Sequence, residues 1–234
     1  MKYLLLLMLG IASLANAADT SPALHAYVAE YDVLRGDRVE AQATISLEST
    51  AAKRWRMHSR TRATAGVAAL AGVNLDETSE FAITDTGPEC RRYHYRQGGL
   101  RTRERWIDCT AGETGISSRD HNGTYHFPTR VGVVDRQIAS LALALDLATG
   151  KHGALTVTVV DRERLEPQHY RTAGEETLDL PIGPTRTIKL ERVHDTGDRA
   201  TTTWFAIEHG WIPVRIVHSG KSGGYELRLR SLKR

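Results

Sequence analysis

The ten residues VEAQATISLE, from Val39 to Glu48, place an apolar side chain at every odd position and a polar one at every even position. Because successive side chains of a strand point to opposite faces of its sheet, this alternation predicts a strand with one buried face. Residues 27–34 precede it through Arg35-Gly36-Asp37, a tight-turn signal. The two segments are therefore predicted to form a hairpin.

The same period of two recurs along most of the chain, and short turns rich in Gly, Asp or Pro separate most neighbouring segments. This regular spacing favours a mainly β fold in which one antiparallel sheet curves into a half-barrel or open barrel. The further expected strands are residues 54–62, 78–84, 90–96, 102–109, 155–161, 168–178, 186–194, 201–208, 212–219 and 225–232.

Two segments depart from this pattern. Residues 135–148 place Ile138, Leu141, Ala142 and Leu145 at helical spacing, begin with Asp135 as a candidate N-cap and end before a glycine. They predict one amphipathic helix across the concave side of the sheet. Residues 63–75 are rich in Ala, Gly and Val and predict a loop or a short helix. Whether that segment is a mobile lid is left open by the sequence.

The N-terminus has the pattern of a cleavable export signal over residues 1–17. Lys2 precedes a short apolar run, and the segment closes with Ala15-Asn16-Ala17, so cleavage is expected before Ala18. The apolar run is shorter than the ~20 residues that cross a bilayer, and no later uncharged stretch approaches that length. We therefore expect a periplasmic protein without a transmembrane anchor after cleavage, although a retained anchor is the alternative.

The mature chain, residues 18–234, contains no linker-like or low-complexity tract, which favours a single half-barrel domain. Loss of Lys2 lowers the basic count from 31 to 30 against 28 acidic residues, so the net charge falls only from +3 to +2. This small charge indicates little about partners. Nucleic acid is not expected as a partner in the periplasm.

Cys90 and Cys109 are the only cysteines and flank Gly98-Gly99 nearly symmetrically. In an exported chain they predict a disulfide-bonded hairpin. If the two cysteines oppose each other, one face of the hairpin contains the disulfide, Ile107 and a set of basic residues, which are Arg92, His94, Arg96, Arg103 and Arg105. The opposite face would contain Tyr93, Tyr95 and Trp106 together with Thr102 and Glu104.

A second series of cations, Arg54, Arg56, His58, Arg60 and Arg62, occupies alternate positions of one predicted strand, while Trp55 and Met57 occupy the others. Like charges that face each other across strands are destabilising unless solvent or anions surround them. One interpretation is an anion-binding surface. The other is a solvated sheet face whose arginines keep the protein soluble and its edges unpaired.

The sequence identifies no catalytic constellation. It contains no G-x-S-x-G, and Ser219-Gly220-Lys221-Ser222 lacks the upstream glycine of a phosphate-binding loop. His121 and His126 lack the spacing of a zinc site. We expect no metal, no cofactor and no enzymatic activity, with an uncharacterised hydrolase as a minor alternative.

Several short motifs resemble the DUF3108 family, exported Gram-negative envelope proteins of unknown function. These motifs are residues 31–36, residues 135–141, residues 172–176, and Trp204 followed by residues 211–216, so the similarity would span nearly the whole mature chain. The resemblance implies a half-barrel with a helix over its concave side, similar to the LolA/LolB lipoprotein carriers and receptors. It supplies no catalytic residues, and it implies that Asp135 and Ser140 cap and seat the helix.

Two functions follow as hypotheses. The first is a non-enzymatic periplasmic binding protein whose half-barrel holds a lipid or another apolar or acylated ligand. Its candidate ligand-binding residues, which could equally form an ordinary core, are Trp55, Tyr93, Tyr95, Trp106, Ile138, Leu141 and Leu145. The alternative is an envelope protein that docks on lipopolysaccharide or an anionic glycan through Arg54, Arg56, Arg60, Arg92, His94, Arg96, Arg103 and Arg105. Ligand identity and oligomeric state stay open.

Overall fold

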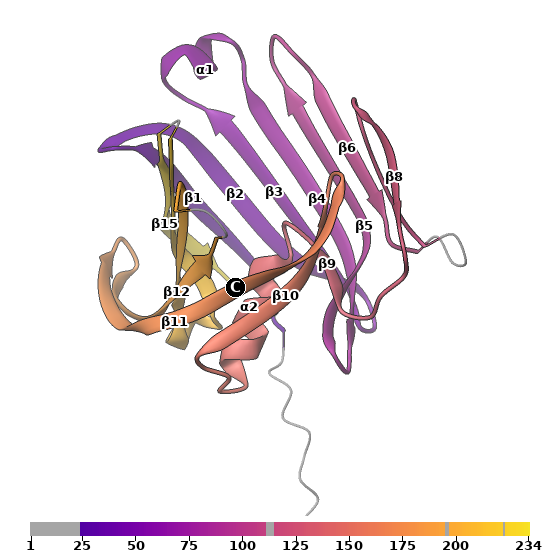
Figure 1. Ribbon diagram of the computed structural model, residues 1–234. Helices are drawn as coiled ribbons and strands as arrows, with labels where there is room; N and C mark the ends of the chain where they lie inside the picture. The colour runs from indigo at the N-terminus through magenta and orange to yellow at the C-terminus, as the bar shows by residue number, and fades with distance from the viewer. Residues whose placement is uncertain (1–23, 111–114, 195–196, 222) are drawn as a thin grey trace, which may run out of the picture.

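The computed structural model describes residues 24–110, 115–194, 197–221 and 223–234 (Figure 1). The predicted signal peptide and its cleavage site before Ala18 lie outside these residues. The first half of the described chain contains β1 (Tyr27–Arg35), β2 (Arg38–Ala51), β3 (Arg54–Ala63), α1 (Gly66–Leu70), β4 (Asn74–Thr84), β5 (Gly87–Gly98), β6 (Arg103–Asp108), β7 (Ile116–Asp120) and β8 (Gly123–Phe127).

The second half contains β9 (Val133–Asp135), α2 (Ala139–Ala148), β10 (Ala154–Asp161), β11 (Arg164–Leu180), β12 (Gly183–Val193), β13 (Arg199–Ala206), a 3-10 turn η2 (Ile207–His209), β14 (Ile212–Gly220) and β15 (Tyr225–Lys233). All the strands form one sheet in the order β8-β7-β6-β5-β4-β3-β2-β1-β15-β14-β13-β12-β11-β10-β9. Neighbours are antiparallel except for β9 and β10. The predicted mainly β, open antiparallel fold is confirmed.

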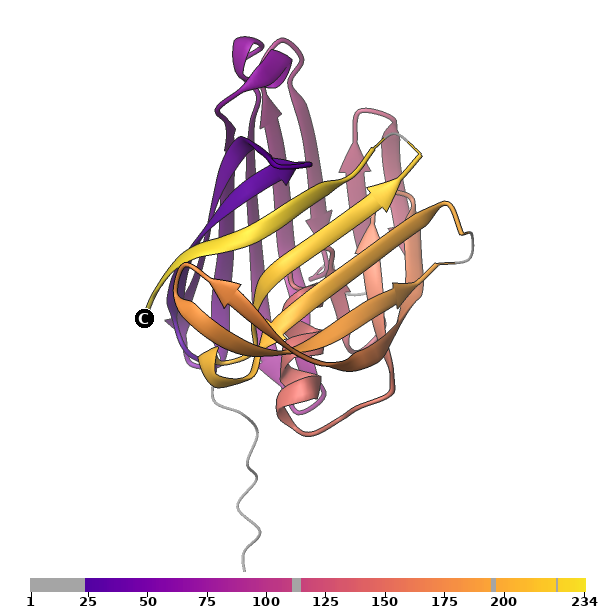
Figure 2. The same cartoon turned by 90° about the vertical axis from the view of Figure 1, so that its left-hand side faces the viewer.

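The sheet curls so that its N-terminal and C-terminal halves face each other (Figure 2). The two edge strands, β8 and β9, are not neighbours in the described sheet. Instead, Val133 of β9 and Val160 of β10 pack on Cys90, Tyr93 and Ile107 of the β5–β6 hairpin. Side-chain packing, rather than a continuous hydrogen-bond ladder, therefore closes the curved sheet.

Helix α2 fills the space between the two halves at one end of the fold (Figure 1). Its buried side chains belong to one hydrophobic cluster with Leu47 and Phe81 from one half and Ile188 and Phe205 from the other. Its buried residues, Ala139, Leu141, Leu143, Ala144 and Leu147, surround most of the helix. The predicted single stripe was too narrow, because Ala142 and Leu145 are only half-buried while Leu143 and Ala144 are buried.

The predicted helix start at Asp135 was wrong. Asp135 is the last residue of β9, and its Oδ1 accepts hydrogen bonds from the backbone N–H groups of Gln137 (2.9 Å) and Ile138 (3.2 Å). The carboxylate therefore stabilises the turn before α2 rather than capping its first turn. Residues 63–75, for which the sequence predicted a loop or a short helix, contain the five-residue helix α1. Among the described residues, no helix combines the length and hydrophobicity that a membrane crossing requires.

The disulfide between Cys90 and Cys109 is confirmed, but the predicted hairpin register was wrong by one residue. Tyr93 lies opposite Ile107, and His94 lies opposite Trp106. The cause is a β-bulge, since Glu80 of β4 pairs with Arg92 while the adjacent Phe81 pairs with Cys90. A bulge inserts one residue and resets the alternation, so Cys90 shares the inner face with Tyr93.

Candidate functional site

The observed register places two candidate residues, Trp106 and Arg105, on the faces opposite to those predicted. Trp106, predicted among the inward aromatics, lies on the outer face, 43% exposed. Its indole stacks on the His94 imidazole, with ring centroids 3.5 Å apart and planes 11° apart. Arg105, predicted on the solvent-facing cationic surface, is buried on the inner face and donates a 2.6 Å hydrogen bond to Asp161. Arg103 is exposed near the end of the hairpin.

The two predicted cationic series are interleaved with carboxylates. Arg56 donates hydrogen bonds to Glu48 on β2 (3.2 Å) and to Glu80 on β4 (3.0 Å). Asp76 pairs with both His58 (3.0 Å) and Arg60 (3.2 Å). The strands on either side of β3 supply the acids, so these cations do not form a patch of one charge.

The same holds for the β5–β6 hairpin. Arg96 lies 3.5 Å from Glu104, and Arg92 is directly opposite Asp108. The expectation that the basic residues of this hairpin share one face and oppose one another was therefore wrong. Arg54 is exposed beside the half-buried Trp55, which packs against the core on the inner face.

The outer face of β2–β8 is hollowed into a groove of about 1040 Å³. Six basic side chains line this groove: Arg56, His58, Arg92, His94, Arg119 and His126. Trp106 lines the same groove, with Glu48, Glu80 and Asp108 as its acidic members. The sequence pattern located the strands of this surface but missed β7 and β8, whose residues complete it.

A charged cluster lies on the inner face where β9 meets β5. The Arg136 guanidinium pairs with the Glu77 carboxylate, and its Nε donates a 2.9 Å hydrogen bond to the Tyr93 hydroxyl. The hydroxyl in turn donates to Glu77 Oε2 at 2.9 Å. Burial raises the pKa of the Tyr93 phenol, so it stays protonated. Two guanidinium groups lie over the Tyr95 ring, that of Arg105 at 5.3 Å and that of Arg136 at 5.2 Å from its centroid.

Sequence reasoning missed Glu77 and Arg136, although Arg136 belongs to the 135–141 motif. Tyr93 and Tyr95, predicted as apolar ligand contacts, belong instead to this charged cluster. The cluster holds the β9 edge against β5, because Glu77 and Tyr93 come from β4 and β5 while Arg136 follows β9 directly. Opposite charges within hydrogen-bond distance compensate for the cost of their burial.

Asp135 anchors the start of the helix segment to β4. Its Oδ1 lies 2.8 Å from Ser79 Oγ, which also lies 2.7 Å from Gln137 Oε1. Its Oδ2 is buried without a hydrogen-bond partner among the described residues. Burial raises the Asp135 pKa to about 6. Because a serine hydroxyl carries a single hydrogen, Ser79 Oγ donates to only one of these two oxygens at a time.

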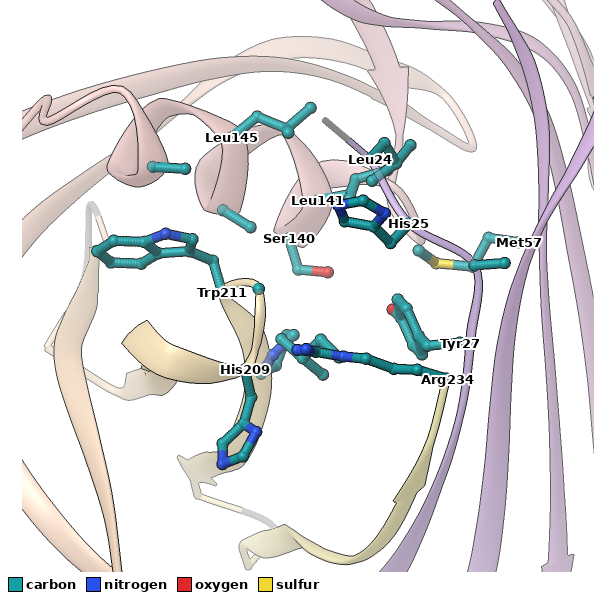
Figure 3. A pocket seen from close by; sticks show the side chains of 16 residues that line it. Leu24, His25, Tyr27, Met57, Ser140, Leu141, Leu145, His209, Trp211 and Arg234 are labelled. Carbon is teal, nitrogen blue, oxygen red and sulfur yellow. The ribbon is translucent and has the colours of Figure 1, made fainter. Parts of the chain in front are cut away.

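An apolar pocket of about 100 Å³ lies beside α2 (Figure 3). Leu141 and Leu145 project from the helix on one side, while Met57 and Tyr27 line the sheet side and Trp211 closes another wall. Burial raises the pKa of the Tyr27 phenol, which keeps this wall uncharged. The basic side chains His25, His209 and Arg234 also line the pocket.

Only Leu141 and Leu145 of the seven predicted ligand-binding residues line this pocket. Ile138 is fully buried in the core, and Trp55 packs against the same core cluster. The structure does not bring all seven residues to one pocket, because the register shift moves Trp106 outward and polar partners contact the two tyrosines. The sequence also missed the contributions of β1 and the C-terminal residue, which only the curled sheet brings to the helix.

The wall formed by Trp211 depends on an unusual turn. Gly210 and Trp211 both have left-handed backbone conformations, with φ of 69° and 60°. The Trp211 N–H donates a 2.9 Å hydrogen bond to the Ala206 carbonyl, which holds this turn between β13 and β14. Positive φ is rare for a bulky residue, and such strain is often found at functional positions. The turn directs the indole toward α2 (Figure 3).

Among the described residues, no group of three or more His, Cys, Asp or Glu side chains is arranged to hold a metal ion. Comparison with curated proteins finds no match. The family model for DUF3108, proteins of unknown function, matches residues 26–230.

Two solved structures align with most of the chain. A β-barrel-like protein of the DUF1849 domain from Brucella abortus aligns with a TM-score of 0.58 and 9% identity, covering 89% of this chain and 97% of that one. A candidate lipoprotein from Parabacteroides distasonis aligns with a TM-score of 0.36 and 7% identity, covering 90% and 96% of the two chains. The first similarity supports the β-barrel-like fold alone.

Proposed function

The chain belongs to the DUF3108 family, whose function is unknown, and we propose that it is an exported, periplasmic binding protein that holds the end of an acyl chain beside helix α2. The single observation that supports this proposal best is the apolar pocket between α2, β1 and the Trp211 turn. The disulfide is in keeping with an oxidising compartment. The proposed role is binding rather than catalysis.

The lining of the pocket matches an amphiphile. Leu141, Leu145, Met57 and Trp211 offer aliphatic, thioether and indole surface to a hydrocarbon chain. Burial of such a chain is favourable by about 0.8 kcal/mol for each methylene group removed from water. Arg234 and His25 are exposed where they border the pocket, so they could pair with a carboxylate or phosphate that stays in solvent.

The volume of the pocket limits how much of an acyl chain it can hold. Sites for drug-sized ligands enclose about 300–1000 Å³, whereas this pocket measures about 100 Å³. It therefore accommodates one chain terminus, and a longer segment would require α2 to move away from β1. The half-buried positions on the pocket side of the helix, Leu145 and Ala148, are where such a movement would lose least packing.

The test uses the mature protein purified from the periplasm. Lipid extraction and mass spectrometry should recover acylated molecules above background, and a fluorescent fatty acid should bind and be displaced by palmitate. Ala148→Phe fills the pocket and should abolish displaceable binding. Thr149→Phe places the same ring at an exposed, neighbouring position that does not line the pocket and should bind as the wild type does.

A protein that retains no lipid and binds no displaceable probe would disprove the proposal. Equal binding by the wild type and by Ala148→Phe would also disprove the proposal, provided that the two proteins unfold at similar temperatures. Arg234→Ser should weaken binding of the fatty acid while leaving that of the corresponding uncharged alcohol unchanged. An identical loss for both ligands would contradict the role of the basic residues at the pocket.

A further inference from the structure

We propose that the outer groove of β2–β8 is a second binding site, which takes an uncharged glycan chain and uses Trp106 as the stacking surface for its sugar rings. The groove measures about 1040 Å³, slightly more than the roughly 300–1000 Å³ typical of sites for small ligands. Its lining residues differ from those of the pocket beside α2, so this inference does not rest on the proposed acyl site.

The strand register arranges the groove as two rows of side chains that cross seven strands. The first row consists of Ser46, His58, Thr78, His94, Trp106, Arg119 and Thr124, each directly opposite the next. The second consists of Glu48, Arg56, Glu80, Arg92, Asp108, Ser117 and His126. All fourteen residues line the groove.

The direction of the rows favours a polymer. Adjacent strands lie about 4.8 Å apart, so a row across seven strands extends roughly 29 Å. This length exceeds a small metabolite and matches an extended chain that lies across the strands. The β6–β8 strands contribute the far end of the groove, which gives this otherwise peripheral part of the sheet a function.

The charges of the second row alternate in sign. Glu48, Arg56, Glu80, Arg92 and Asp108 follow one another, and Arg56 is hydrogen-bonded to the glutamates on both sides. With Arg119 from the first row, three arginines balance three carboxylates across the groove, and the three histidines that line it add positive charge only when they are protonated. Such a surface has no net field that would attract a polyanion. Carboxylates and guanidinium groups in alternation instead offer acceptors and donors to neutral hydroxyl groups.

Trp106 supplies the apolar part of the site. Trp106 lies near the middle of the groove and is 43% exposed, so part of its indole is open to a ligand. The imidazole of His94 stacks against it at 3.5 Å and fixes its orientation. Burial lowers the pKa of His94, so the imidazole is neutral at neutral pH and adds no charge to the stack. A rigid, oriented indole costs little entropy when a sugar ring packs on it.

The experiment presents the full mature protein to an array of neutral, sulfated and phosphorylated glycans, followed by calorimetric titration of the strongest neutral ligand. We expect binding to neutral linear glycans with an affinity that changes little when salt is raised. Trp106→Ala should weaken it on the order of tenfold or more, whereas Trp106→Phe should retain most of it. His94→Ala should weaken glycan binding by an intermediate factor, because the indole remains but loses the imidazole that fixes its orientation.

The matched control is Tyr225→Ala, which removes a ring from the other histidine–aromatic pair, His218 and Tyr225, whose centroids are 4.6 Å apart on β14 and β15. It does not line the groove and should bind glycan normally. Absence of any neutral ligand, binding confined to charged glycans that salt abolishes, or full binding by folded Trp106→Ala would each overturn the inference. Ala148→Phe should leave glycan binding unchanged, which separates this site from the acyl pocket.

Discussion

Arg105 Nη1 lies 2.6 Å from Asp161 Oδ1 and links β6 to β10, two strands that are not neighbours in the sheet. The Arg105 side chain is only 6% exposed, while that of Asp161 is 36% exposed. This ion pair therefore bridges the space between the two halves of the curled sheet. Because the described edge strands do not pair with each other, contacts of this kind hold the fold closed.

Arg105→Ala should lower the free energy of unfolding by about 3 kcal/mol, the lower end of the cost of breaking a buried ion pair, since Asp161 keeps access to water. Urea unfolding measures the change. Arg96→Ala, which removes an exposed arginine 3.5 Å from Glu104 on the same hairpin, should cost at most about 1 kcal/mol. Equal costs for the two variants would contradict a bridging role for Arg105.

Asp135 should make stability depend on pH. Its pKa is raised from an unfolded value of 3.8 to about 6 by burial, so the folded protein binds more protons than the unfolded chain between these values. The free energy of unfolding should therefore fall as the pH rises from about 4 to above 6, by about 3 kcal/mol from this residue. Unfolding midpoints measured across that range test the sign.

Asp135→Asn should remove most of that pH dependence, because the amide does not titrate yet still accepts the hydrogen bonds of Gln137 and Ile138 at its oxygen. Asp135→Ala should destabilise the protein at every pH, since it leaves two backbone N–H groups without the carboxylate. An unchanged pH profile in Asp135→Asn would assign the dependence to other groups.

Removal of the disulfide should weaken the region where β9 and β10 pack on the hairpin. The bond closes a loop with a sequence separation of 19 residues, which corresponds to about 3 kcal/mol. Cys90→Ser together with Cys109→Ser should show this loss in urea unfolding. Wild-type protein treated with reductant serves as the comparison and should lose a similar amount; full stability in both would contradict the expected contribution.

Gly210→Ala should affect both stability and the acyl pocket. Alanine at a φ of 69° costs about 1–2 kcal/mol, and its Cβ would lie 3.3 Å from Arg234 Nη2, which must then shift. Fatty-acid binding should weaken together with thermal stability. Gly36→Ala is the matched control, because Gly36 has a φ of 58° with open space around it and lies away from the pocket. It should lose similar stability while binding normally.

Local patterns in the sequence were sufficient to predict the fold class. The alternation in residues 39–48 corresponds to β2, in which Ala41, Ala43 and Leu47 are buried as expected. The helix was correctly placed but begins at Ala139 rather than Asp135, because the Asp135 side chain binds the two N–H groups of a turn. Strands β7 to β9 were missed, since five or fewer residues give too short an alternation to recognise.

The candidate sites depended on details that the alternation of side chains along a strand does not reveal. One bulge at the β4–β5 pairing moved Trp106 to the outer groove and Arg105 into the interior. The acids that neutralise Arg56 and Arg60 come from neighbouring strands, so their effect appears only once the strands are paired. Arg136, by contrast, was within reach of sequence reasoning because it follows Asp135 in the motif that indicated the family.

The sequence by itself predicted a mainly β chain with one amphipathic helix and one disulfide, because strand alternation, helical spacing and a lone pair of cysteines are local or pairwise signals. Tertiary structure alone decided which residues share a site. The curl of the sheet brings Tyr27, Leu141, Trp211 and Arg234 together, although they are far apart along the chain. Such long-range proximity depends on the register and twist of every intervening strand, and a single bulge reverses the face on which a side chain lies.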